Sequence, residues 1–178
     1  MINMVKLPTN NKRMILRVAR GHFATSHSHI NYYIDVTMQK TRLSEAAETA
    51  KELVHMYKST TIVDTILCLD GTQVIGTCMA NELTKDGFRN MNAHQTIYII
   101  TPEYTSGSQI ILRDNGGQVA GLAAIFATTH EFMGMRVNSI FDPNNLPDYQ
   151  SYESRDCPMC KAGQPIDALV NSFGYSSL

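Results

Sequence analysis

The sequence predicts an α/β fold, a doubly wound and mainly parallel sheet with a small N-terminal hood. Short apolar runs rich in β-branched residues alternate along the chain with segments of helical spacing, as in residues 62–69 and 74–83. Alternating strands and helices are typical of parallel βαβ units. No repeat, low-complexity segment or linker interrupts this order, so we expect a single domain over residues 1–178.

Composition excludes several classes of protein. Of the 178 residues, 43% are hydrophobic and 17% charged, which indicates a globular chain with a core. The net charge of -1 leaves no broad basic face for nucleic acid or an anionic membrane. No apolar stretch approaches the roughly 18 residues that span a bilayer. The N-terminus lacks the apolar run of a secretory signal, and four cysteines make no disulfide framework, so we expect a cytoplasmic protein with reduced thiols.

The first elements predict the hood, over about residues 20–40. A helix is expected through residues 14–19, capped at residues 10–11 and ended by Gly21. A short strand at residues 22–25, a polar turn at 26–29 and a strand at 31–36 then predict an antiparallel hairpin.

A second helix is predicted after Ser44, because its apolar and charged residues separate into two stripes. The apolar stripe is Ala46, Ala47, Ala50, Leu53, Val54 and Tyr57. The charged stripe is Glu45, Glu48, Lys51, Glu52 and Lys58.

Residues 62–83 predict a strand, a tight loop at Asp70, Gly71 and Thr72, and a helix. Backbone N–H groups at such a loop form an anion site, and ligands of open α/β sheets bind beyond the carboxyl ends of the strands. The alternative is a plain turn followed by a helix cap, since one glycine is a weak phosphate signal.

The second half continues the alternation. Residues 85–95 form a polar connection, 96–101 a strand, 103–108 a loop and 109–115 at most two helical turns. A buried run at residues 119–128 and a strand at 137–141 follow, and residues 142–178 are expected to be loop-rich because of four prolines.

Three segments in this order resemble orotate phosphoribosyltransferases of the type I phosphoribosyltransferase family. Residues 21–35 are similar to the family's hood, residues 62–72 to its pyrophosphate loop, and residues 156–165 to its Cys-Pro-Leu-Cys…Gly-x-Pro tail. The resemblance implies a type I phosphoribosyltransferase-like domain whose C-terminal tail completes the hood, and a homodimer.

The resemblance also implies a reaction, in which a nucleobase displaces pyrophosphate from phosphoribosyl pyrophosphate with the help of Mg²⁺. It implies that the loop from Asp70 through Gly71 to Thr72 binds pyrophosphate, and that Lys85 or Arg89 offsets leaving-group charge. The base pocket implied by the same comparison consists of Ser28, Tyr32 and Tyr33.

The family's phosphoribosyl motif, an acidic pair followed by Thr-x-Gly-Thr, is missing from this chain. In one alignment the 5′-phosphate loop is Thr105, Ser106, Gly107 and Ser108, without the acidic pair. In the other, residues 102–115 are the flexible catalytic loop and the chain lacks roughly one βα unit of about 30 residues. A non-catalytic nucleotide-binding or regulatory module of the same fold is therefore an alternative function.

A second alternative is a zinc-binding interaction domain. Cys157 and Cys160 have the spacing of a zinc knuckle, and His22, His27 and His29 are candidates for the other ligands. A structural turn without metal is the preferred interpretation of the two cysteines, because these histidines lie far away in sequence and because the resembled family carries a similar turn without metal.

Overall fold

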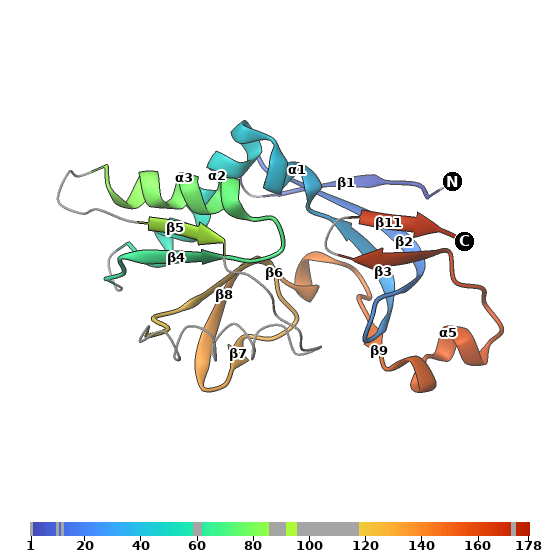
Figure 1. Cartoon of the computed structure of the whole chain (residues 1–178). Coiled ribbons are helices and arrows are strands. Elements are labelled where there is room, and N and C mark those ends of the chain that lie inside the picture. The colour runs from blue at the N-terminus through green and yellow to red at the C-terminus, as the bar shows by residue number, and fades with distance from the viewer. Residues whose placement is uncertain are drawn as a thin grey trace.

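The computed structural model describes residues 2–9, 11, 13–58, 62–85, 92–95, 118–171 and 174–178. Its largest sheet has the strand order β11-β10-β2-β3-β9, with β1 paired to β2 (Figure 1). These strands are β1 (Val5–Pro8), β2 (Ile15–Ala24), β3 (His29–Asp35), β9 (Ser151–Tyr152), β10 (Ala168–Asn171) and β11 (Gly174–Ser177). Within this sheet β10 pairs parallel to β2, and every other pairing is antiparallel.

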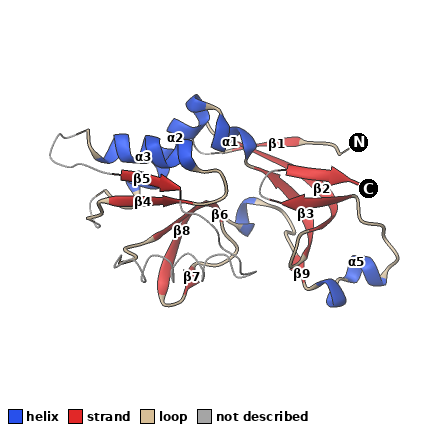
Figure 2. Cartoon of the chain, viewed as in Figure 1, coloured by secondary structure: helices blue, strands red, loops and turns tan. Residues whose placement is uncertain are grey.

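The prediction of a doubly wound, mainly parallel sheet is wrong for the described residues. They form this mixed six-stranded sheet, a parallel pair of β4 (Thr65–Cys68) and β5 (Asn92–Gln95), and a mixed sheet in the order β6 (Leu122–Phe126), β8 (Met135–Phe141) and β7 (Glu131–Phe132) (Figure 2). The main physical reason lies at the N-terminus, where a hairpin with a short turn supplies two antiparallel strands. Strands of the C-terminal tail then pair with both of them.

The helix predicted over residues 14–19 is wrong, because residues 15–19 belong to β2, the longest strand described. Leu16 and Val18 are 1% and 3% exposed and pack in one apolar cluster, whereas Ala19 packs in another. Alternate residues of a strand point to opposite faces. Both faces of β2 are covered, so its sequence shows no clean alternation and resembles a helix.

The predicted antiparallel hairpin is confirmed as β2 and β3, with β3 beginning at His29. Its register shifts between Arg20 and Phe23, where two residues of β2 lie opposite one residue of β3. Such a β-bulge bends the strand and redirects the side chain at that position.

The helices after the hairpin are α1 (Thr37–Thr41), α2 (Leu43–His55) and α3 (Gln73–Leu83). The predictions of α2 and α3 are confirmed, and both bury their apolar stripes in one cluster. Its buried members are Ala46, Ala50, Leu53, Val54, Ile75, Met79 and Leu83. Glu45, predicted on the charged stripe of α2, is instead 8% exposed and accepts hydrogen bonds at 2.9 Å from both guanidinium nitrogens NH1 and NH2 of Arg17.

The predicted order of strand, loop and helix is confirmed as β4 (Thr65–Cys68), the loop at residues 69–72 and α3. The strand is shorter than expected, and of its side chains Cys68 is buried. The chain then returns in β5 (Asn92–Gln95), parallel to β4, although the sequence predicted a polar connection there. This is a βαβ unit.

The last strands before the tail are β6 (Leu122–Phe126), β7 (Glu131–Phe132) and β8 (Met135–Phe141). They confirm the strand predicted at residues 137–141 and part of the run at 119–128, although β6 is largely half-buried. The predictions for residues 96–115 lie outside the described residues.

The tail contains more structure than predicted. Besides β9, β10 and β11 it has 3-10 turns at Pro143–Asn145 and Ser154–Asp156 and the short helix α5 (Pro158–Lys161). β9 pairs with β3 and β10 with β2, so the tail lies against both strands of the N-terminal hairpin. Among the helices described, none has the length and apolar character needed to cross a bilayer.

Candidate metal centre

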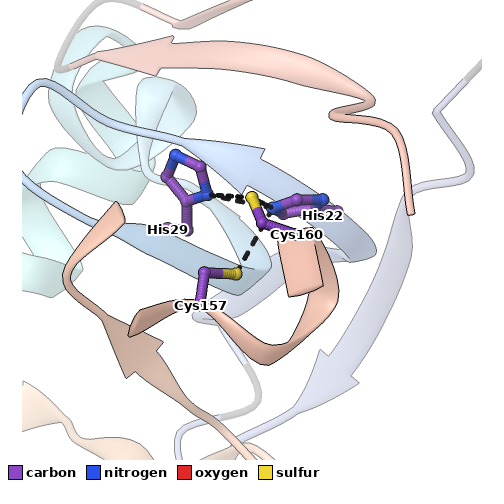
Figure 3. A group of neighbouring side chains, drawn as sticks. All are labelled: His22, His29, Cys157 and Cys160. Carbon is purple, nitrogen blue, oxygen red and sulfur yellow. Dashed lines mark hydrogen bonds between the residues drawn. The ribbon is translucent and has the colours of Figure 1, made fainter. Parts of the chain in front are cut away.

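Four side chains from opposite ends of the chain converge beside the bulge of β2. They are His22, His29, Cys157 and Cys160, and one ligand atom from each lies within 4.8 Å of all the others (Figure 3). His22 and Cys157 are fully buried, His29 is 8% exposed, and Cys160 is exposed. A buried histidine pair facing two thiols is the side-chain set of a Cys₂His₂ zinc site.

The hairpin positions the two histidines. His22 lies in the bulge of β2, and His29 is the first residue of β3, paired with Ala24 across the hairpin. Their ring centroids are 5.0 Å apart with an interplanar angle of 61°, and Nε2 of His22 lies 3.1 Å from Nδ1 of His29.

The tail positions the two cysteines. Cys157 caps α5, Pro158 is its first residue, and Cys160 lies three positions after Cys157, on the same side of the single helical turn. The turn ends at Gly163, whose φ of 71° favours glycine, and its N–H donates to the carbonyl of Cys160. A compact knuckle thus holds both sulfur atoms toward the hairpin.

Two of the distances between ligand atoms match tetrahedral zinc, whereas the two that involve Nδ1 of His29, at 3.1 Å and 3.2 Å, are slightly shorter. With Zn–N near 2.0–2.1 Å and Zn–S near 2.3 Å, ligand atoms of a tetrahedron lie roughly 3.3–3.8 Å apart. Nε2 of His22 lies 3.6 Å from Sγ of Cys157 and 3.7 Å from Sγ of Cys160. Nδ1 of His29 lies 3.2 Å from Sγ of Cys160. A zinc ion would therefore need only small side-chain shifts.

The tautomer of His22 is fixed by its surroundings. Its Nδ1 lies 3.0 Å from the carbonyl oxygen of Gln164 and 3.2 Å from that of Pro165. Because carbonyls only accept hydrogen bonds, Nδ1 carries the proton and Nε2 presents a lone pair to the other three ligand atoms. Metal-binding histidines are typically oriented by such a hydrogen bond from the second ring nitrogen.

Metal binding would have to displace a thiol proton. Desolvation at the cluster, followed by the hydrogen bond and charge of Cys157, raises the pKa of the Cys160 thiol. A bound divalent cation would stabilise the thiolate that serves as its ligand.

Asp167 supports the bulge that carries His22. Its Oδ2 accepts a hydrogen bond of 2.7 Å from the backbone N–H of His22, and its own N–H donates to the carbonyl of His22 at 2.8 Å. Gly21 makes room for this carboxylate, because a Cβ there would lie 2.6 Å from Oδ2 of Asp167.

The structure brings together two of the three candidate histidines with the two cysteines. His27 lies in the exposed turn of the hairpin, where its N–H donates to Oγ1 of Thr25, and is not part of the cluster. The interpretation of the cysteines as a turn without metal rests partly on distance in sequence, and the pairing of the tail with the hairpin removes that reason.

The residues of the implied base pocket are not gathered in one place. Tyr32 and Tyr33 are neighbours on β3 and pack in separate clusters on opposite faces of the sheet. Tyr32 lies under Arg20, with 5.8 Å from the guanidinium carbon to the ring centroid, whereas Tyr33 packs on Phe23. The Ser28 hydroxyl meets that of Thr25 within the hairpin turn.

The implied pyrophosphate loop lies at the carboxyl end of β4. Asp70 and Gly71 have φ angles of 53° and 76°, and the N–H of Thr72 donates to the carbonyl of Leu69 within the turn, so that amide is not available to an anion. The sequence did not single out Lys40, which is 7% exposed and donates from Nζ to the Asp70 carbonyl at 2.5 Å. Burial lowers the pKa of Lys40.

Of the residues assigned to leaving-group charge, Lys85 is exposed after α3 and pairs with Glu82. Arg89 and the candidate phosphate loop Thr105, Ser106, Gly107 and Ser108 lie outside the described residues. The Mg²⁺ that the resemblance implies belongs with phosphoribosyl pyrophosphate and not with this cluster, whose nitrogen and sulfur ligands do not suit a cation that prefers oxygen.

The most complete constellation in the described part of the chain is therefore the cluster of two histidines and two cysteines. In a comparison with known protein families, no family model matches this chain.

Proposed function

We propose that the protein binds one zinc ion through Nε2 of His22, Nδ1 of His29 and the sulfur atoms of Cys157 and Cys160. The observation that carries the proposal is the convergence of these four ligand atoms within 4.8 Å of one another. Nitrogen and thiolate ligands in tetrahedral array suit zinc better than the harder cations.

The proposed zinc is structural. Four protein ligands complete its tetrahedral shell and leave no position for a substrate or a reactive water, which catalytic zinc requires. The ligands come in pairs from the hairpin and from the tail, so the ion joins segments that are 135 residues apart at His22 and Cys157. Its role is to stabilise a domain that a small core alone would hold less firmly.

Cobalt substitution tests this proposal directly. Full-length protein, purified under reducing conditions and stripped of metal, is titrated with Co²⁺ and then with Zn²⁺. We expect the absorption of tetrahedral cobalt together with a thiolate charge-transfer band. Both should disappear when Zn²⁺ displaces the bound Co²⁺.

The control for this titration is the double variant Cys157→Ser/Cys160→Ser, which should show neither signal. The variant Cys78→Ser removes a half-buried thiol of α3 and should leave both signals intact. A Co²⁺ spectrum of the unmodified protein without thiolate charge transfer would contradict the proposal.

A second candidate function is the phosphoribosyltransferase activity that the family resemblance implies, with Mg²⁺, in a homodimer. The observation that favours it is the βαβ unit of β4, α3 and β5, with the ammonium group of Lys40 meeting the loop at Asp70. A buried cation at the carboxyl end of a parallel strand is the type of group that an anionic ligand needs. The separation of Tyr32 and Tyr33 counts against the base pocket that the resemblance implies.

Calorimetry with phosphoribosyl pyrophosphate and Mg²⁺ tests the second candidate, using Lys40→Met as the variant and Lys85→Met as the control. Heat of binding that Lys40→Met abolishes and Lys85→Met preserves would support it. If the unmodified protein gives no heat at millimolar ligand, the transferase function fails. The non-catalytic nucleotide-binding alternative fails if no nucleotide of a panel shifts the melting temperature.

The cytoplasmic location predicted from the sequence fits the proposed zinc site, because a reducing compartment keeps the two thiols available as ligands. Fractionation of cells that express the protein would test this location.

A further inference from the structure

We infer that the metal holds residues 157–178, here called the latch, against the N-terminal hairpin. Loss of the metal releases this latch without unfolding the helical core formed by α2 and α3. The inference rests on the proposed zinc site and adds what the site controls.

The latch makes few backbone contacts of its own. In the described part of the sheet, β10 pairs with β2 at two positions, Ala168 opposite Phe23 and Leu169 opposite Ala24. The segment between the knuckle and β10 is exposed, and β11 pairs only with β10 among the described strands. Local openings occur first where buried apolar contacts and protected hydrogen bonds are few.

The metal supplies the missing attachment. Two of its proposed ligands, Cys157 and Cys160, lie at the start of the latch, and the other two lie on the hairpin beneath it. Without a cation, the attachment there consists of hydrogen bonds around His22, the contact of Asp167 with its backbone, and the weak contacts of the two sulfur atoms with the imidazoles. A bound metal that exists only in the closed form shifts the population toward that form.

Opening would uncover a specific apolar surface. Ala168 and Val170 of the latch pack against Phe23 and Tyr33, and the ring centroid of Tyr175 lies 5.2 Å from that of Tyr33. Release of these side chains exposes two aromatic rings and leaves the second half of β2 as an open strand edge. Open edges of this kind pair with other chains.

The helical core lies apart from the latch. The cluster formed by α2 and α3 contains no buried residue from positions 157–178, and its partly buried neighbours also lie outside the latch. The opening is therefore confined to the hairpin and the tail.

Hydrogen exchange read by mass spectrometry tests the inference. The full-length protein is compared with zinc bound, after stripping with a chelator, and as Cys157→Ser/Cys160→Ser, with zinc content measured in each sample. We expect exchange to become faster by roughly tenfold or more in β10, β11 and the second half of β2, with α2 and α3 unchanged. His27→Ala is the control and should keep both zinc and protection.

Equal exchange in β10 and β11 with and without bound zinc would overturn the latch while leaving the zinc site intact. Equal acceleration in α2 and α3 would also overturn it, because the metal would then hold the whole fold. Absence of zinc from the unmodified protein under saturating metal would instead refute the proposed function, and the latch with it.

Discussion

Nε2 of His22 lies 3.1 Å from Nδ1 of His29, and the sulfur of Cys160 lies within 3.7 Å of both nitrogens. Because Nδ1 of His22 donates to backbone carbonyls, Nε2 of the same ring is unprotonated and has a free lone pair. Two imidazole nitrogens this close need a shared proton or a shared cation between them. A zinc ion satisfies both nitrogens and neutralises the adjacent thiolates.

Replacement of His29 separates a ligand role from general effects of histidine loss. His29→Ala should weaken zinc binding by more than the roughly 10–100-fold that loss of an outer-shell partner costs. His27→Ala, two residues away in the exposed turn, should bind zinc like the unmodified protein. Competition with a chromophoric chelator measures both affinities, and equal affinities of the two variants would rule out His29 as a ligand.

Gly21→Ala tests the support of the site without removing a ligand. The new Cβ would lie 2.6 Å from Oδ2 of Asp167 and 2.9 Å from the Phe23 ring, so the carboxylate must leave its bond to the His22 N–H. We expect zinc affinity to fall about 10–100-fold, as for other outer-shell changes. Asp167→Ala should show a similar loss, and unchanged affinity in both variants would mean that this support is dispensable.

The ion pair between Arg17 and Glu45 should stabilise the contact of β2 with α2. Both side chains are largely buried, at 15% and 10% exposed, and the guanidinium donates two hydrogen bonds. Arg17→Met removes both short hydrogen bonds from the buried Glu45 carboxylate and leaves it the longer 3.5 Å contact with Arg42, which should lower the free energy of unfolding by about 2–4 kcal/mol. Denaturant unfolding measures this change.

The control for that experiment is Arg13→Met. Its guanidinium is 76% exposed and lies 3.5 Å from Glu48, so the change should stay within about 0.5 kcal/mol. A loss for Arg17→Met no larger than for Arg13→Met would show that the buried pair adds nothing to stability.

Tyr33 should make stability depend on alkaline pH. Burial, followed by the charge of Asp35, raises its pKa from 10.0 to about 12. The pKa of Tyr33 is higher in the folded state than in the unfolded state. Its contribution to the free energy of unfolding is therefore complete below about pH 10 and is lost as the pH rises through about 12. Unfolding experiments should show Tyr33→Phe losing less stability than the unmodified protein across this interval, and identical losses would contradict the prediction.

Helical periodicity predicted α2 and α3 well, because each has one apolar stripe buried against the other. The same approach failed at residues 14–19, where both faces of β2 are covered and the apolar residues follow no single period. The tail was expected to be loop-rich because of its prolines. Pairing of β10 with β2 depends on a distant strand, which local pattern does not reveal.

The candidate site was half predictable. The spacing of Cys157 and Cys160 marked two ligands, and the histidines were noted, but nothing local linked residues near position 25 to residues near position 160. The link is tertiary: a bulge turns His22 into the cluster, and the pairing of β9 with β3 brings the tail beside His29. The signal that separates His27 from the other two is the hairpin register, which places it in the turn.

The most direct test of the zinc site is native mass spectrometry of full-length protein loaded with one equivalent of Zn²⁺ under reducing conditions. We predict a single bound zinc ion per chain, absent from Cys157→Ser/Cys160→Ser and retained in His27→Ala. Zinc content in the unmodified protein no higher than in the double variant would contradict a metal centre at His22, His29, Cys157 and Cys160.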